Sequence, residues 1–411
     1  MTSGDDEVQV LVEELSAELG RSVLVDDASL RLVAYSPTYG NEDEVRRTAI
    51  LTRETPRAVR DIHFSQGIAT ASRPVRTAAK PELGLESRVC VPIRCQGALF
   101  GYLWLIDADD SLTDDDRTHA ERCAADIGAA MYRRQELEKP RRELEQRLVE
   151  ALLEGEASER EEAVHELLAG DMLLPGTGVA AVVVRAWVGP DEELSSAQKA
   201  RLSLALDQFR QALPIRHVLS LVRSDHGVVL LASDPALRRT GGLPELARRL
   251  HDSLDVDAGG EIALGFSDEC EHLQDAHRAY AHARIAARVA SCVPEHSPVA
   301  GWDELGPYRM LAQLAPGAEP EELLHPGLPR LFALQSKESL VATLEAYLDH
   351  GCDTKLTAEE LFLHRASLYY RLQRIEELTG ANLKSGADRL SLHLSLKLAW
   401  LVGLHPGRRR S

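Results

Sequence analysis

Side chains that can recognise another molecule are concentrated near the C-terminus, between Thr357 and Gly380. This stretch reads as two short helices that meet at His364 and Arg365, and the second carries leucine and isoleucine at helical spacing on one face. Its other face offers hydroxyl, phenol, amide and guanidinium groups, which hydrogen-bond to base edges and phosphates. A short helix, a polar junction and a second helix with a basic outer face are the parts of a helix-turn-helix.

The ends of both helices can be placed from local patterns. We expect the first helix to begin at Thr357, because Glu360 three residues later completes a capping-box pattern. Its apolar positions are Ala358, Leu361 and Phe362. The second helix is expected to stop at the glycine that closes the stretch, since glycine readily takes the left-handed conformation that follows many helices.

Charge is distributed unevenly along the chain. From Lys355 to the C-terminus, lysine and arginine outnumber aspartate and glutamate by five, whereas the whole chain has a net charge of −18. The residues before Lys355 therefore carry −23. A basic end on an acidic body favours a nucleic-acid-binding segment, although a polar-faced helical hairpin is also common as a solvated surface without a partner.

Residues 356–383, LTAEELFLHRASLYYRLQRIEELTGANL, resemble the C-terminal helix-turn-helix of the PucR/CdaR family of bacterial transcriptional regulators. The same block is more distantly similar to Fis-type DNA-binding ends. Ala366 and Ser367 stand where the family has Asn and Thr, so the hydroxyl is kept and the amide is lost. The family's base preference therefore does not carry over to this chain.

The resemblance implies that the start of the second helix contacts double-stranded DNA. Arg365 and Ser367 are expected to touch bases or adjacent phosphates. Arg371 lies nearer the Leu368 face, and His364 is expected to position the turn. The predicted DNA-binding residues are His364, Arg365, Ser367, Tyr369, Tyr370, Arg371 and Arg374.

The first region, up to about residue 135, reads as a helix over 8–19, antiparallel strands and a long exit helix. Two strands form a hairpin across Gln96-Gly97, and the second, 98–106, is apolar on both faces, which predicts a central strand. The phrases PVRTAAKPELG and RVCVPIRCQGALFGYLWLID resemble the GAF-like N-terminal region of some PucR-type regulators. This resemblance implies a GAF- or PAS-like sensor domain.

Such a sensor domain could hold a small-molecule effector between its sheet and the covering loops. The side chains that we expect to line that pocket are Tyr35, His63, Cys90, Tyr102 and Trp104. The alternative for each residue taken alone is structural, because aromatic residues on a central strand mostly form core and a single histidine mostly lies at the surface.

The segment that follows the sensor is a long helical stretch interrupted by Pro140. We expect the proline to kink or split this helix, because it removes a backbone donor. Leu144, Leu148 and Leu152 continue an apolar stripe at steps of four residues. The stripe could pair with a second copy of the chain or dock on its own neighbouring domain, and too few turns are apolar to choose.

The middle region has the order strand, helix, hairpin, helix, strand, helix, which is a split βαβ arrangement. Nucleotide cyclases share it, and the region resembles the GGDEF-like domain of PucR/CdaR regulators. The hairpin turn, 223–227, lacks paired glycines and an acidic residue after Asp225, and the strand end at Arg185 offers no carboxylate for Mg²⁺. We therefore expect a catalytically inactive, degenerate domain that serves dimerisation or signal relay.

No motif predicts a metal or another cofactor. His272, His277 and His282 recur every five residues and do not share a helix face. A G-x-G motif at 176–178 precedes a strand and so lacks the context of a dinucleotide site. Near the C-terminus, 390–398 alternates leucine with polar residues, yet we expect a helix there, because leucine, alanine and lysine favour helix and no partner strand is near.

Length and composition complete the expectation. A chain of 411 residues, 44% hydrophobic, holds several domains, and its scattered cysteines, its start and the lack of a long apolar stretch favour a cytoplasmic protein without membrane contact. We expect a multidomain α+β fold: a GAF/PAS-like antiparallel sheet domain (1–135), a helical linker (136–165), a split-βαβ, degenerate nucleotide-cyclase-like domain (166–300) and an all-α helix-turn-helix domain (301–411, with the motif at 357–380).

The function that this organisation predicts is a DNA-binding transcriptional regulator, acting as a homodimer or higher homo-oligomer and not as an enzyme. The sensor and the inactive cyclase-like domain would control the helix-turn-helix. Two alternatives stay open: a cyclic-dinucleotide enzyme working through the middle domain, and a protein-interaction module whose helix-turn-helix binds no DNA.

Overall fold

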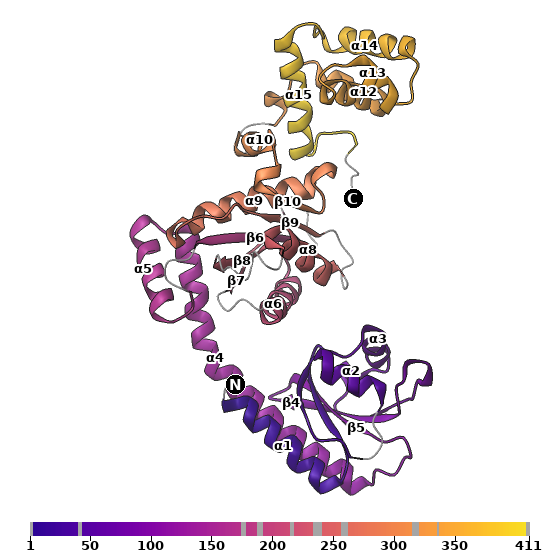
Figure 1. The fold of residues 1–411 in the computed structure, drawn as a ribbon, viewed down its shortest axis with the longest axis vertical. Helices are drawn as coiled ribbons and strands as arrows, with labels where there is room; N and C mark the ends of the chain where they lie inside the picture. Colours follow the sequence, from indigo (N-terminus) through magenta and orange to yellow (C-terminus); the bar gives the residue numbers. More distant parts are fainter. Residues whose placement is uncertain are drawn as a thin grey trace. The chain divides into compact units, whose positions relative to one another are not determined.

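The computed structural model describes residues 3–39, 43–173, 178–186, 192–213, 218–232, 241–255, 262–314, 320–334 and 337–407. The chain divides into two compact units, Met1–Glu143 and Leu144–Ser411 (Figure 1). Within the described ranges no helix is long and apolar enough to cross a membrane. Three predicted features lie outside the described residues. They are Ser336, which the sequence suggests as the N-cap of the helix that follows it, the start of the G-x-G motif, and a basic tail, Arg408 to Arg410, that could add phosphate contacts.

The first unit is built on a five-stranded antiparallel sheet in the order β2-β1-β5-β4-β3. Its strands are β1 (Val23–Asp27), β2 (Leu32–Tyr35), β3 (Val75–Thr77), β4 (Arg88–Cys95) and β5 (Ala98–Ile106). β5 lies at the centre, as the sequence predicted from its two apolar faces. Gln96 and Gly97, with φ of 49° and 83°, form the predicted hairpin turn between β4 and β5.

Helices cover both faces of this sheet. One face packs against α1 (Ser3–Leu19) and the first part of α4 (Asp114–Glu154), and Leu103 and Leu105 of β5 point to that core. The other face is covered by α2 (Glu44–Thr52), α3 (Arg57–Ser65) and the 3₁₀ turn η1 (Ile68–Thr70). Strand alternation therefore directs two side chains of β5, Tyr102 and Trp104, to this second core.

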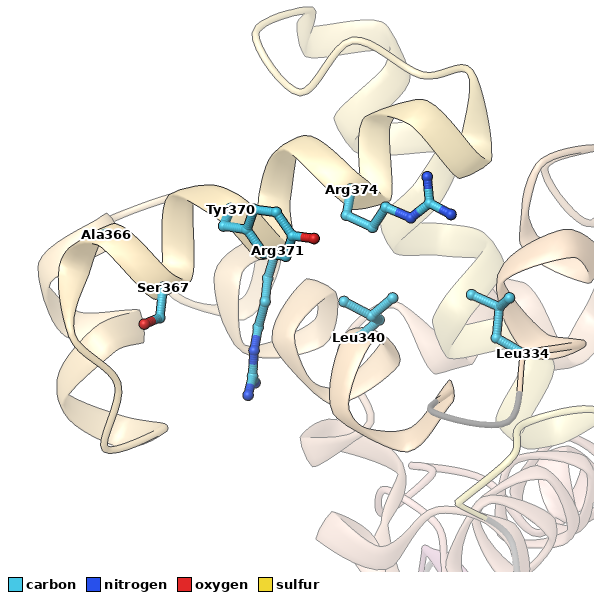
Figure 2. Close-up of a pocket in the computed structure, with 7 residues that line it drawn as sticks. All are labelled: Leu334, Leu340, Ala366, Ser367, Tyr370, Arg371 and Arg374. Atoms are coloured by element: carbon cyan, nitrogen blue, oxygen red, sulfur yellow. The ribbon is translucent and has the colours of Figure 1, made fainter.

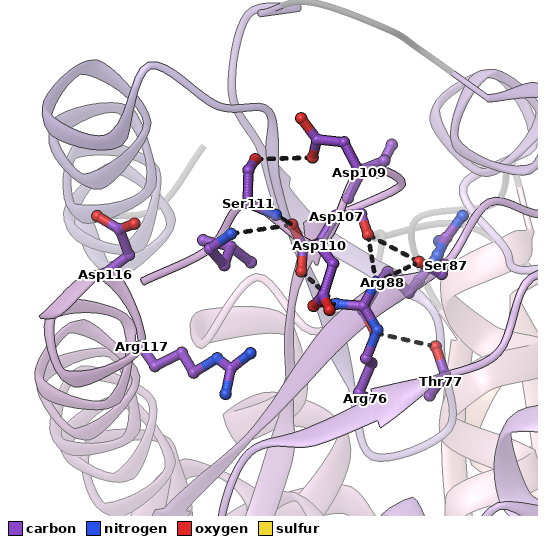
Figure 3. Close-up of polar contacts among 12 residues, drawn as sticks. Arg76, Thr77, Ser87, Arg88, Asp107, Asp109, Asp110, Ser111, Asp116 and Arg117 are labelled. Carbon is purple, nitrogen blue, oxygen red and sulfur yellow. Dashed lines mark hydrogen bonds and ion pairs between the residues drawn. The ribbon is translucent and has the colours of Figure 1, made fainter. Parts of the chain in front are cut away.

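Acidic residues after β5 fix the entry into α4 (Figure 3). Asp107 is fully buried, and its Oδ1 accepts hydrogen bonds from the backbone N–H groups of Ser111 and Leu112 at 3.0 and 3.1 Å. Arg76 pairs with the Asp107 carboxylate and, at 2.6 Å, with Asp110. The cluster is explained by loop closure, and no group of three or more His, Cys, Asp or Glu in the described ranges is placed to hold a metal ion.

α4 is a single helix of 41 residues that continues through Pro140, so of the two expected outcomes, a kink or a split, the split is wrong. Ile127 belongs to the core of the first unit, whereas Leu152 belongs to a core of the second. Glu138 forms ion pairs with Arg134 at 3.0 Å and with Arg142 at 3.2 Å, each one helical turn away. Packing at both ends and these pairs offset the single backbone hydrogen bond that a proline removes.

The second unit begins with a sheet in the order β10-β9-β6-β8-β7. Its strands are β6 (Val179–Ala186), β7 (Val218–Val222), β8 (Gly227–Ala232), β9 (Ile262–Phe266) and β10 (Val299–Gly301). When β6 to β9 are numbered 1 to 4 in chain order, they lie in the sheet in the order 4-1-3-2, which is the order of a split βαβ fold. Every neighbouring pair among these four strands is antiparallel. The sequence reasoning missed β10, a three-residue strand that pairs in parallel with β9.

Two helical layers enclose this sheet (Figure 1). One face packs on α6 (Ser196–Ala212) and α8 (Gly242–Asp255). The other packs on α9 (Ala276–Cys292), α5 (Ala157–Ala169) and the end of α4. All eight positions of β6 are buried because it lies between β8 and β9 and under both layers.

The C-terminal helices form two cores, and α9 contributes to one of them. The helices are α10 (Tyr308–Leu314), α11 (Leu328–Phe332), α12 (Lys337–Asp349), α13 (Thr354–Glu360), α14 (Arg365–Thr379) and α15 (Gly386–Leu401). α10 and α15 pack on α9, while α11, α12, α14 and the middle of α15 surround Leu344 and Leu368. The remaining 3₁₀ turns are η2 (Pro81–Leu83), η3 (Leu273–Asp275), η4 (Pro294–His296), η5 (Trp302–Glu304) and η6 (Pro320–Leu323).

α15 confirms that the alternating leucines of 390–398 form a helix. The sequence spacing also predicts one helical stripe of Leu390, Leu394, Leu398 and Leu401, and this prediction is wrong at its start, because Leu390 is 60% exposed. Leu392 and Leu396, four residues apart, are fully buried instead and pack toward α14. The helix thus turns a different leucine face inward in its first half.

Candidate nucleic-acid interface

The N-cap of α13 lies four residues earlier than the one that the sequence predicted at Thr357. Asp353 is its N-cap, and its Oδ1 accepts from the backbone N–H groups of Lys355 at 2.7 Å and Leu356 at 3.2 Å. Thr357 is buried inside the helix and donates its hydroxyl to the Asp353 carbonyl at 2.6 Å. The predicted capping box at Thr357 is therefore wrong, because the helix begins upstream and Asp353 satisfies its first free N–H groups.

The turn between α13 and α14 has a geometry that sequence spacing did not predict. Phe362 takes the left-handed conformation, with φ of 53°, and its side chain is 96% exposed. Its N–H donates to the Glu359 carbonyl at 3.2 Å, and the Leu363 N–H donates to the Ala358 carbonyl at 2.9 Å. This is a Schellman motif. The prediction that Phe362 belongs to the apolar face of α13 is wrong.

α14 is held at both ends and along one face. His364 caps it, because its Nδ1 accepts from the backbone N–H of Ala366 at 3.3 Å. Leu368 and Ile375 are fully buried against α11 and α12. Gly380, with φ of 75°, ends the helix as predicted. The exposed face of α14 is thus presented in a fixed orientation.

A groove of about 630 Å³ runs beside that exposed face (Figure 2). Its lining residues are Leu334, Leu340, Ala366, Ser367, Tyr370, Arg371 and Arg374. Four predicted DNA-binding residues therefore come together at one place. Arg365 and Tyr369 are exposed but do not line the groove, since the 3.6-residue helical period turns them toward the other side of α14.

The two groove arginines have different partners. Arg371 donates from Nη1 to the buried Thr343 hydroxyl of α12 at 3.2 Å, so this contact helps to seat α14. Arg374 pairs with Glu377 at 2.8 Å, and both side chains are about half exposed. Exposed pairs of this kind contribute little stability, so Arg374 can exchange its partner for a phosphate.

Comparison with known protein families separates the chain into three modules. The PucR C-terminal helix-turn-helix domain matches residues 340–398, the GGDEF-like domain matches 154–289, and the GAF domain matches 5–131. The chain is a PucR/CdaR-type regulator. It therefore joins a DNA-binding helix-turn-helix to a GAF sensor domain.

Two relatives align with nearly the whole length of this regulator, and a third aligns with a short stretch of 77 residues only. The proline-responsive transcriptional activator PutR of Bacillus subtilis is 25% identical over 405 residues, which are 95% of this chain and 96% of PutR. The transcriptional activator AdeR of the same organism is 20% identical over 404 residues, 96% of this chain and 93% of AdeR. The carbohydrate diacid regulator of Escherichia coli is 43% identical over 77 residues, 19% of this chain and 20% of that protein.

Side chains at the hairpin turn between β7 and β8 of the GGDEF-like domain form a chain of ion-pair and hydrogen-bond contacts. Arg185 Nη1 lies 3.3 Å from Asp225 Oδ2, and Asp225 Oδ1 lies 2.7 Å from His226 Nδ1. His226 Nε2 lies 2.8 Å from the Tyr280 hydroxyl of α9. Burial lowers the pKa of His226 despite the Asp225 carboxylate beside it. A guanidinium stands at the end of β6, where bound Mg²⁺ would need carboxylates.

Four of the five residues predicted for the effector pocket come together in the GAF domain. His63 of α3 and Trp104 of β5 have ring centroids 4.5 Å apart, and Tyr102 and Trp104 have centroids 6.1 Å apart. Cys90 of β4 is buried in the same core. Tyr35 is not part of this group, because its side chain is 40% exposed at the edge strand β2.

The sequence reasoning missed Asp26, which faces the same group from β1. It pairs in register with Tyr102 and is 2% exposed. Burial raises the pKa of Asp26 to about 7, and Asp27 adds to that effect while Arg88 opposes it. The signal was present in the sequence, since Asp26 shares a strand face with the buried Leu24.

Two buried polar atoms of this group, His63 Nδ1 and the Tyr102 hydroxyl oxygen, have no hydrogen-bond partner among the described residues. Trp104 and Thr55 hydrogen-bond to the Asp26 carboxyl group and oppose the rise of its pKa. Burial also lowers the pKa of His63 to about 3, so its ring is neutral. Unsatisfied buried polar atoms are costly in a folded protein and each one needs an explanation.

Proposed function

We propose that this regulator reads operator DNA with the exposed face of α14 and acts in the cytoplasm as a homodimer. The geometry of α14 supports the proposal: its buried face and both caps fix the helix, while Arg365, Tyr370 and Arg374 are exposed around the rest of its surface. One recognition helix reads few base pairs, so a pair of half-sites needs two copies of the chain.

Arg365→Ala is expected to weaken binding to the protein's own promoter region by roughly 1–3 kcal/mol, because one charge-assisted contact to a base or phosphate is lost. Gel-shift titrations at several salt concentrations measure the change. The matched control is Arg248→Ala on α8, whose side chain is 62% exposed, and its affinity should equal that of wild type. Unchanged affinity of Arg365→Ala at every salt concentration would count against the assignment.

The salt dependence also tests the rival in which the helix-turn-helix binds a protein partner instead of DNA. Each phosphate contact releases condensed counterions, so the affinity for DNA should fall steeply as salt rises. Competitor DNA without the promoter sequence should then displace the wild-type protein only weakly from the promoter fragment. Absence of any salt-dependent DNA binding would favour the protein-interaction reading.

We further propose that the GGDEF-like domain has no cyclase activity and relays signals. Purified protein incubated with GTP or ATP and Mg²⁺ should form no cyclic dinucleotide, because Arg185 occupies the position where a metal would need a carboxylate. Chromatographic detection of the product at a rate that depends on Mg²⁺ would overturn this. The relay role is supported by ion pairs from α4 into the domain, Glu154 with Arg223 at 2.7 Å and Glu145 with Arg210.

The GAF domain is proposed to bind its effector under α2 and α3, where the buried polar side chains of Asp26, His63, Tyr102 and Trp104 lie together. A carboxylate beside aromatic rings is suited to an amine or ammonium group. PutR is named for its response to proline. We therefore propose a small, amine-bearing effector for this chain, with Asp26 as its ionic partner.

A further inference from the structure

Phe362 is unfavourable in the free regulator for two independent reasons. A side chain with a Cβ is strained in the left-handed conformation, and glycine is the usual residue at this position of a Schellman motif. The phenyl ring is also 96% exposed and so gains nothing from burial in this chain. A glycine at this position would be less strained and would expose no ring. The Phe362 ring therefore does not stabilise the folded chain.

The position of Phe362 in the motif identifies what the ring can reach. It lies three residues before Arg365, the first residue of α14. In a helix-turn-helix the N-terminal end of the recognition helix is the end that meets base edges in the major groove. The turn that carries Phe362 is therefore on the side of the domain that approaches DNA.

We propose that Phe362 contacts the C5-methyl group of a thymine at the edge of the major groove and so adds an apolar component to operator recognition. This inference rests on the proposed DNA reading by α14. Thymine methyl groups are the apolar feature of the major groove, and phenylalanine is among the side chains that contact them. The contact buries the ring only in the complex and offsets there the strain that the turn carries in the free protein.

Phe362→Gly separates the free protein from the complex. The substitution relieves the left-handed strain and removes an exposed ring, so the melting temperature should rise by about 2–4 °C, the size expected for a modest gain in a domain of this length. Affinity for the promoter fragment should fall about tenfold. Phe362→Leu keeps an apolar side chain and should lose less affinity. A lower melting temperature of Phe362→Gly would overturn the inference, since the ring would then stabilise the fold.

The thymine contact is tested on promoter fragments amplified with deoxyuridine in place of thymidine, which lack the methyl groups. Wild type should bind the deoxyuridine fragment about tenfold more weakly, whereas Phe362→Gly should discriminate less than threefold. Equal loss by Phe362→Gly on both fragments would overturn the methyl contact and indicate a contact with the backbone or a second copy. Leu390→Ala, at another exposed apolar side chain of this domain, should bind both fragments as wild type does.

The outcomes distinguish this inference from the proposed function. If wild type shows no salt-dependent binding to the promoter fragment, the DNA reading itself fails. If wild type binds and Arg365→Ala weakens it while Phe362→Gly does not, only the role of Phe362 fails.

Discussion

Gly265→Ala is expected to destabilise the GGDEF-like domain by about 3 kcal/mol or more, at the upper end of the range for overpacked cores. A Cβ on this residue of β9 would lie 2.0 Å from the backbone nitrogen of Ala287, 2.3 Å from the Ala283 carbonyl oxygen and 2.6 Å from the Ala286 carbonyl carbon. All three belong to the backbone of α9. The clash therefore cannot be relieved by a side-chain rotation, and β9 and α9 must separate.

Urea denaturation of the full chain measures this effect through the loss of β9 and α9 structure. Because α9 also packs on α10 and α15, we expect the same substitution to weaken DNA binding. Gly386→Ala is the matched control: it is the first residue of α15, nothing lies within 4 Å of the place that a Cβ would take, and its stability should be equal or slightly higher. An unchanged midpoint for Gly265→Ala would contradict the close packing.

Asp26→Asn is expected to stabilise the GAF domain at pH 8 by roughly 2–4 kcal/mol, with a smaller gain at lower pH. The pKa of Asp26 is about 7 in the folded chain against an ordinary value of 3.8, so the folded state holds the proton more tightly. Below pH 3.8, Asp26 is protonated in both the folded and the unfolded state, so its ionisation does not lower the free energy of unfolding. Between that value and pH 7 the unfolded state ionises first, so stability falls as pH rises, and above pH 7 the cost is complete.

Hydrogen exchange of peptides from β1 and β5, followed by mass spectrometry at pH 5 and pH 8 after correction for intrinsic rates, reports this change within the GAF domain. Asp61→Asn, at an exposed residue of α3, is the control and should leave protection unchanged. Equal protection of wild type and Asp26→Asn at pH 8 would contradict the buried carboxylate. An amine-bearing effector that pairs with Asp26 should protect wild type at pH 8 and leave Asp26→Asn unaffected.

Local sequence patterns were sufficient where a single rule decided the structure. The β4–β5 hairpin followed from two strands around Gln96-Gly97, and the central place of β5 followed from its two apolar faces. The buried face of α14 followed from the spacing of Leu368, Leu372 and Ile375. In each case neighbouring residues alone determine which side chains share a face.

The errors arose where distant residues decided the outcome. Thr357 and Asp353 are both plausible caps, and burial of Thr357 selected the upstream residue. Pro140 did not split α4, because the helix packs in a hydrophobic core on each side of it. Phe362 looked like core because its left-handed turn has no signal in a residue that is not glycine.

The candidate sites show the same limit. The helical period identified the exposed residues of α14, but the bond from Arg371 to Thr343 joins residues 28 positions apart and could not be predicted from spacing. The polar group under α2 and α3 gathers residues from β1, β4, β5 and α3. Asp26 stood out only after the fold had placed Trp104 and His63 around it.

The continuity of α4 has a consequence for how such regulators can be assembled from parts. Since one helix supplies Ile127 to the first core and Leu152 to the second, a different sensor has to be joined between these two residues if each domain is to keep its own part of the helix. Exchange of sensor domains by recombination is therefore expected to favour junctions in the mostly exposed stretch 135–143, which contains Pro140.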